Sequence, residues 1–148
     1  MKKDDLFLRS EIEYKYRNTE KGFLSIKVKE IFKPSAIKKR GYIPKCNKKE
    51  IKKSFYEHIK KHGRNCFYCN DPWTYIINRY VPGSKENKSD KGKKRKNIKN
   101  FSMDRLDNSK TYSIDNIIFC CNECNMNKRS ISIKLIKRLH EIIVERNL

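Results

Sequence analysis

Two Cys-x-x-Cys pairs, Cys66/Cys69 and Cys121/Cys124, are the feature that most restricts what this chain can fold into. A Cys-x-x-Cys turn brings two thiolates close enough to share one ion, and two such turns supply the four sulfurs of a tetrahedral zinc site. Closed coordination leaves no position for water or substrate, so this zinc would be structural and its binding free energy would stabilise a small domain. The spacing therefore predicts a zinc site that joins two distant segments of the chain.

The remaining cysteines, Cys46 and Cys120, have no such pair. Cys120 directly precedes Cys121, and only Cys121 has the required spacing from Cys124, so we expect Cys120 to be a packed strand residue. Six cysteines with paired spacing indicate metal ligands in a reducing compartment more than disulfides. The early apolar patch at residues 6–8 is too short for a signal peptide. We therefore expect an intracellular protein, in the host-cell cytoplasm, or in the nucleus if the host is eukaryotic.

Charge narrows the class of partner. The 148 residues carry 37 Lys and Arg against 17 Asp and Glu, a formal net charge of +20. A chain of this length buries one modest core, so we expect one domain with extensions. Such an excess of positive charge favours an anionic partner, and nucleic acid is the leading candidate, with DNA expected first and RNA as an alternative. No apolar stretch approaches the ~20 residues that span a bilayer, so we expect no membrane partner.

A Lys-rich segment at residues 83–100 contains almost no apolar side chains. Because it cannot contribute to a core, we expect a mobile loop that tracks a nucleic-acid backbone. A nuclear localisation signal has a similar composition and is an alternative. The candidate nucleic-acid contacts in this loop are Lys93, Lys94, Arg95 and Lys96.

Hydrophobic periodicity predicts an α+β protein. Apolar residues at steps of three and four predict a helix over residues 48–62, which Gly63 would end. A β-branched and aromatic run predicts a strand over residues 117–119, and the second cysteine pair would open a helix that reaches about residue 128. The final helix, capped by Ser130 or Ser132, has an apolar stripe that we expect to pack in the core, or alternatively to form a partner surface. That stripe comprises Leu135, Ile136, Leu139, Ile142 and Ile143.

The segment between the cysteine pairs reads Asp104-Arg105-Leu106-Asp107-Asn108-Ser109-Lys110-Thr111-Tyr112 and continues to Asp115-Asn116-Ile117. Together with Cys121, Cys124, Asn125 and Lys128, it resembles the zinc-supported HNH endonucleases of phages and homing elements over residues 65–129. The family's common loop variant Asp-Arg-Ile-Asp-Asn-Ser-Lys-Gly-Tyr differs at Leu106 and Thr111. The resemblance implies a small ββα-metal (His-Me finger) core stapled by the Cys₄ zinc site, with helical N- and C-terminal extensions. The corresponding division of the chain is 1–63, 64–130 and 131–148.

The resemblance also implies an activity, the metal-dependent hydrolysis of DNA phosphodiester bonds by nicking or cutting. Asp104 matches the family's metal-binding acid, and Asn116 matches the Asn that fixes the loop through backbone hydrogen bonds. Asn125 matches the final position, which is Asn in the group resembling recombination endonuclease VII. Oxygen donors at Asp104 and Asn125 suit Mg²⁺ or Mn²⁺. Lys128 and Arg129, which follow Asn125, are expected to contact nucleic acid.

One residue departs from the family pattern. Arg105 occupies the position of the usual general base, His, and a guanidinium cannot accept a proton near neutral pH. Arg105 can instead contact phosphate. The base would then be Asp107, a hydroxide on the cation, or His58 or His62, and these alternatives stay open. The alternative function is a catalytically degenerate, zinc-stabilised module that binds nucleic acid.

Overall fold

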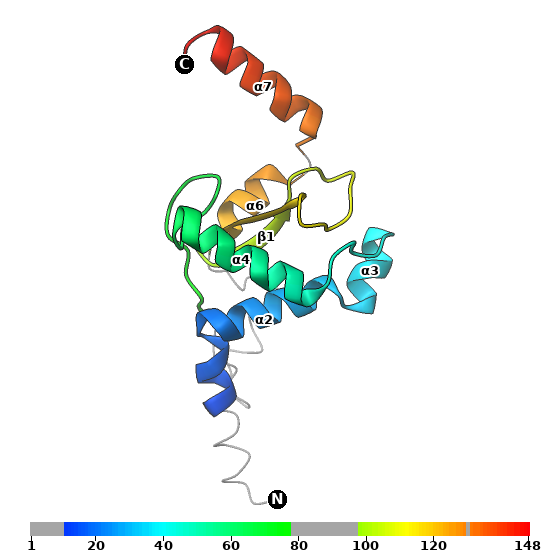
Figure 1. Ribbon diagram of the computed structural model, residues 1–148, viewed down its shortest axis with the longest axis vertical. Helices are drawn as coiled ribbons and strands as arrows, with labels where there is room; N and C mark the ends of the chain where they lie inside the picture. Colours follow the sequence, from blue (N-terminus) through cyan, green and yellow to red (C-terminus); the bar gives the residue numbers. More distant parts are fainter. Residues whose placement is uncertain (1–10, 78–97, 130) are drawn as a thin grey trace, which may run out of the picture.

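The computed structural model describes residues 11–77, 98–129 and 131–148 (Figure 1). Residues 11–17 are helical, and the elements that follow confirm the α+β class. None of the helices in these ranges has the length and apolar character needed to cross a membrane. The further elements are α2 (Glu20–Ile31), α3 (Pro34–Arg40), α4 (Lys48–His62), β1 (Phe101–Arg105), β2 (Ile117–Cys121), α6 (Asn122–Lys128) and α7 (Ile133–Glu145).

Helix α4 confirms the prediction for residues 48–62. Its N-terminus is a capping box, in which the Asn47 side chain accepts from the backbone of Glu50 while the Glu50 carboxylate accepts from the backbone of Asn47. Gly63 ends the helix at a positive φ of 69°, where a residue without a Cβ has no steric penalty. Ile51 and Phe55 face inward and are fully buried.

The N-terminal helices begin and end at residues suited to those positions. The Thr19 side chain caps α2 by accepting from the backbone of Gly22. Pro34 occupies the first turn of α3, where its missing N–H is not needed, and Gly41 ends α3 in the left-handed conformation at φ 79°. Residues 11–31 thus form two helical segments broken at Thr19.

Strands β1 and β2 form a two-stranded antiparallel sheet. In this register Ser102 lies opposite Cys120 and Asp104 lies opposite Ile118. Because side chains alternate across a strand, these four point to one face of the sheet, which helix α6 contacts. The other face carries Phe101 and Phe119 and packs against α4. The sheet therefore separates α4 from α6.

The hydrophobic core joins the N-terminal helices to the sheet. Phe55 of α4 packs against Trp73, Phe101 and Phe119, with ring centroids 5.0–6.0 Å apart. Val28 of α2 belongs to the same buried cluster. Trp73 also belongs to this cluster, and only 5% of the residue is exposed. Buried residues on both sides of residue 63 share this one cluster. The division of the chain at residue 63 stays a prediction.

The predicted Lys-rich loop falls almost wholly outside the described residues, and Lys93, Lys94, Arg95 and Lys96 with it. Its last residues, however, are anchored. The buried side chain of Asn100 accepts hydrogen bonds from the Thr74 hydroxyl and the Ile76 backbone and donates to the Ile76 carbonyl. The Lys99 ammonium lies 2.8 Å from Asp71 Oδ2 and 3.0 Å from Glu123 Oε2. The expectation of a mobile loop is therefore wrong for these last residues, which bonded polar groups hold in place.

Helix α7 corrects another expectation. Ser132 caps it by accepting from the backbone of Leu135, as predicted, but none of its residues is buried. The stripe residues Leu135, Leu139 and Ile143 are 47%, 46% and 47% exposed. Figure 1 shows the helix extending away from the sheet and the helices around it. Core packing of this stripe is therefore wrong, and the alternative of a partner surface remains.

Candidate functional site

The four paired cysteines converge as their spacing predicts. The Sγ atoms of Cys66, Cys69, Cys121 and Cys124 all lie within 4.8 Å of one another. Tetrahedral zinc with Zn–S bonds of about 2.3 Å needs sulfurs about 3.8 Å apart, and Cys69 Sγ lies 4.0 Å from Cys121 Sγ. The cluster can therefore hold a metal such as zinc with only a small contraction.

Local backbone structure presents each cysteine pair as a turn. The first turn is closed by the Asn70 N–H, which donates to the Cys66 carbonyl, and Asn70 adopts a positive φ of 60° that asparagine tolerates. The second pair lies at the start of α6, where the Cys121 sulfur accepts from the Cys124 N–H. The backbone of Phe67 donates to the carbonyl of Phe119 in β2. The first turn is thus bonded to the strand that carries the second pair.

Protonation of the sulfurs depends on their surroundings. Burial of Cys66 opposes the thiolate, but backbone N–H groups of Cys69, Cys121 and Tyr68 outweigh it and lower the pKa of the thiol. Burial raises the pKa of Cys69 and Cys124, so loading zinc at physiological pH would release protons from these thiols.

Cys120 is a buried strand residue, as predicted, and lies outside the cluster of four. Its sulfur donates to the Ser102 carbonyl at 3.8 Å, and burial raises the pKa of its thiol. Cys46 is also buried, and its sulfur donates to the Tyr112 carbonyl at 3.6 Å. Both cysteines therefore contribute to packing.

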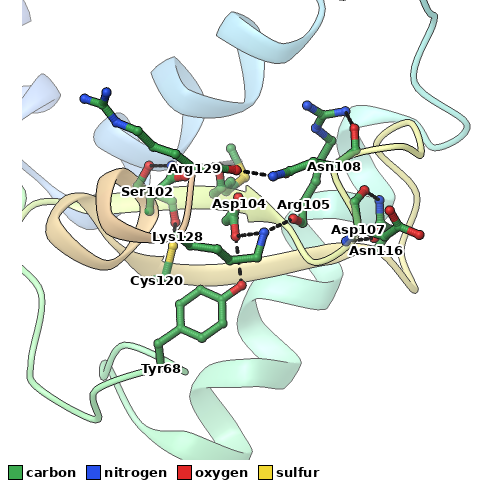
Figure 2. A network of polar contacts seen from close by, with 12 residues as sticks. Tyr68, Ser102, Asp104, Arg105, Asp107, Asn108, Asn116, Cys120, Lys128 and Arg129 are labelled. Atoms are coloured by element: carbon green, nitrogen blue, oxygen red, sulfur yellow. Dashed lines mark hydrogen bonds and ion pairs between the residues drawn. The ribbon is translucent and has the colours of Figure 1, made fainter. Parts of the chain in front are cut away.

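The carboxylate of Asp104 is the centre of a polar network that joins three elements (Figure 2). Its Oδ2 accepts a hydrogen bond of 2.8 Å from the Tyr68 hydroxyl, in the first cysteine turn. The same oxygen lies 3.0 Å from the Lys128 ammonium at the end of α6. Both side chains of the Asp104–Lys128 pair are 7% exposed. Burial, together with the hydrogen bond to Asp104, raises the pKa of Tyr68, so its hydroxyl remains a donor.

Asn125 lies beside Asp104 across the same face of the sheet. Its Nδ2 donates to the Ser102 hydroxyl at 2.8 Å and to the Met103 carbonyl at 3.3 Å. A carbonyl can only accept, so this contact orients the amide with Oδ1 directed elsewhere. Within the described parts of the chain, the hydrogen bonds of these two side chains leave Asp104 Oδ1 and Asn125 Oδ1 without a partner.

A cavity of about 690 Å³ brings the two predicted metal ligands together. Asp104 and Asn125 both line it, and Arg129 and Lys27 contribute positive charge. Asp104 is the only carboxylate among the described lining residues, which include no histidine. The remaining lining residues are Ser102, Met103, Arg105, Asn108, Tyr112, Asn122 and Met126.

The guanidinium of Arg105 is bonded mainly to the loop that follows β1. Its Nη1 donates to the carbonyls of Asn108 and Lys110, at 3.0 and 2.8 Å. The group also stacks near the rings of Tyr42 and Tyr112, at 4.9 and 5.6 Å from their centroids. These contacts hold the loop, whereas the contact of Arg105 with a phosphate stays a prediction.

Asn116 holds the loop through hydrogen bonds to its backbone, which is the role that the family resemblance implies. Its Oδ1 accepts from the Asp107 N–H at 2.8 Å, and its Nδ2 donates to the carbonyls of Asp107 and Thr111. Asn116 is only 4% exposed, so these bonds replace the hydrogen bonds to water that its side chain gives up on burial. The loop is also joined to the end of α6, because the Asn108 amide donates to the Arg129 carbonyl.

Three residues predicted as alternative general bases make other contacts in this structure. Asp107 accepts from the hydroxyl and backbone of Ser109, and these bonds hold the pKa of its carboxyl low. His58 contacts Phe119 and Trp73 on the α4 side of the sheet, and His62 lies next to His58. Both rings therefore lie on the α4 side of the sheet, whereas Asp104 lies on the other face, so these contacts do not support either histidine as the base beside Asp104.

Lys128 corrects a further prediction, its contact with nucleic acid. Its ammonium points inward, bonds the Arg105 carbonyl at 2.7 Å and pairs with Asp104. Arg129, the next residue, is exposed and lines the cavity, so its predicted role stays a prediction. Tyr68 is a site residue that sequence reasoning missed. The available signal was its position between Cys66 and Cys69, because the zinc site would bring that turn close to the strand that carries Asp104.

Comparison of the chain with protein-family models, with curated proteins and with solved structures found no match. The function of this site is therefore inferred from its own residues and their geometry.

Proposed function

We propose that this chain is a metal-dependent HNH-type endonuclease that hydrolyses DNA phosphodiester bonds by nicking or cutting. The observation that carries the proposal is the convergence of Asp104 and Asn125 on one cavity that Lys27 and Arg129 also line. These are the two residues that the family pattern assigns to the catalytic cation. The order β1, β2, α6 and the cluster of four cysteines give further support to the proposal.

The chemistry of the donors suits Mg²⁺ or Mn²⁺. The Asp104 carboxylate and the Asn125 amide offer hard oxygen ligands, and water and phosphate oxygens would complete the shell. When bound, the cation would supply positive charge that activates water and stabilises the developing charge on the phosphate and the departing 3′ oxygen. The zinc at the four cysteines is structural in this proposal.

The chain's own residues would orient this site. Tyr68 and Lys128 both bond Asp104 Oδ2, so the carboxylate is held with Oδ1 available. Arg129 and Lys27 also line the cavity, where they would contact phosphates near the scissile bond. Asn116 and Arg105 hold the loop after β1. None of these residues replaces the missing histidine base, so water activation would depend on the cation.

A second function is favoured by a specific observation. Lys128 already neutralises Asp104 in a buried ion pair, and such a pair can persist without any cation. With Arg105 at the usual base position, the chain would then be a zinc-stabilised module that binds nucleic acid without cleaving it. Its positive charge suffices for nonspecific binding.

A plasmid-nicking assay separates the two functions. We expect the parent to convert supercoiled plasmid to open circles with Mg²⁺ or Mn²⁺, and Asp104→Ala and Asn125→Ala to lose most of this activity. Asp115→Asn is the matched control, since Asp115 is exposed and does not line the cavity. DNA binding without nicking by the parent would support the binding module. Equal nicking by the parent and both alanine variants would refute the site.

A further inference from the structure

A second cavity of about 390 Å³ continues from the one at Asp104. The two cavities share Lys27, Ser102, Met103, Tyr112 and Asn125, so they form one groove. The extension runs along α2 and α3, elements that lie outside the part of the chain that resembles a nuclease. We call the combined feature the α2–α3 groove.

Cations from these two helices line the extension. Lys39 of α3 is exposed and has no bonding partner in the described ranges. Lys27 of α2 lines both cavities and lies 3.4 Å from Glu30 in an exposed pair of i,i+3 spacing. Exposed pairs of this kind contribute little, so a phosphate can compete for the ammonium. Arg40, by contrast, is held by the carbonyls of Ile31 and Ala36.

We propose that the α2–α3 groove binds the phosphodiester backbone of nucleic acid, with Lys27 and Lys39 contacting phosphates that follow the one at Asp104. This inference rests on the proposed function. It assigns the N-terminal helices a direct role in holding substrate. Arg129 lies in the Asp104 cavity, away from the extension, so the backbone enters past Arg129 and leaves past Lys39.

The salt dependence of binding tests the groove without any cleavage. Removing one phosphate contact makes the slope of log K against log salt less negative by about 0.9, so Lys27→Ala/Lys39→Ala should change the slope by about 1.8. Lys49→Ala/Lys60→Ala is the matched control, because it removes the same charge from exposed positions of α4 across the sheet. Fluorescence anisotropy of a labelled duplex, with zinc-loaded protein and no added Mg²⁺, gives both slopes.

The outcomes separate the groove from the nuclease. A parent that binds DNA and a groove variant whose slope equals that of the α4 control would overturn the groove and leave the nuclease standing. A parent that binds no DNA would overturn both. A slope change confined to the groove variant supports the proposal, including when the parent does not nick plasmid.

Discussion

The buried pair between Asp104 and Lys128 gives a quantitative prediction. The charged atoms are 3.0 Å apart, and both side chains are 7% exposed. At an effective dielectric constant of about 20, two unit charges at this distance attract by about 5.5 kcal/mol. Lys128→Met removes the positive partner and leaves the Asp104 carboxylate buried beside the Tyr68 hydroxyl alone. We expect the free energy of unfolding to fall by about 3–5 kcal/mol, the usual cost of leaving one buried charge unpaired.

A double-mutant cycle isolates the pair. In Asp104→Asn/Lys128→Met both charges are absent, so the double variant should be more stable than the single Lys128→Met protein. We expect a coupling energy of about 2 kcal/mol or more. The control cycle is Lys53→Met with Glu57→Gln, whose groups lie 3.9 Å apart and are 81% and 56% exposed. Its coupling should stay below about 1 kcal/mol.

Urea unfolding followed by tryptophan fluorescence gives these free energies. Trp73 is the only tryptophan and is 5% exposed, so its emission reports on the core. Zinc must be held at one concentration, because metal binding raises the apparent stability. A coupling between Asp104 and Lys128 no larger than that of the exposed control would refute the reasoning. It would mean that water screens the pair and that Lys128 does not position Asp104.

Three further predictions concern other parts of the site. Cys121→Ser should lose the bound metal in elemental analysis and unfold in circular dichroism, whereas Cys120→Ser should keep both metal and fold. Tyr68→Phe removes a hydrogen bond to a charged group and should lower the free energy of unfolding, measured in urea, by about 1–2 kcal/mol. An unchanged free energy would mean that water, and not Asp104, satisfies the hydroxyl. Burial lowers the pKa of His58, with neighbouring His62 adding to the effect. The unfolded chain then takes up the proton first, so stability should decrease as pH falls below about 6.5. His58→Gln should flatten this decrease in urea titrations at several pH values, and an unchanged profile would contradict it.

The cysteine cluster and the loop after β1 are predictable from sequence because their determinants are local or fixed by coordination. Four thiolates at paired spacing allow few arrangements. Asn116 satisfies the backbone of a loop only nine residues upstream, at Asp107. Helix α4 is equally predictable, since its cap at Asn47, its apolar period and Gly63 all agree.

Other features depend on which elements meet, and no periodic pattern encodes that. The stripe of α7 predicts an amphipathic helix correctly, but periodicity does not say which surface covers the apolar face. Sequence reasoning assigns Lys128 to nucleic acid from its place after Asn125 in the family resemblance, and that pattern does not say which way the side chain points. Its burial follows from the approach of α6 to Asp104. Glycine often marks a helix boundary, yet Gly22 lies inside α2, where a Cβ would overlap the Tyr16 carbonyl.

The network around Asp104 also bears on how a catalytic cation would bind. Tyr68 and Lys128 both withdraw negative charge from Oδ2, so the carboxylate would attract Mg²⁺ less strongly than an unpaired one. Asn125 would add a neutral oxygen, and Arg129 and Lys27, which also line the cavity, would repel a cation. The negative charge that would favour cation binding must then come from a phosphate. That phosphate would neutralise the rim and add an oxygen ligand, so cation and DNA would each raise the affinity of the site for the other.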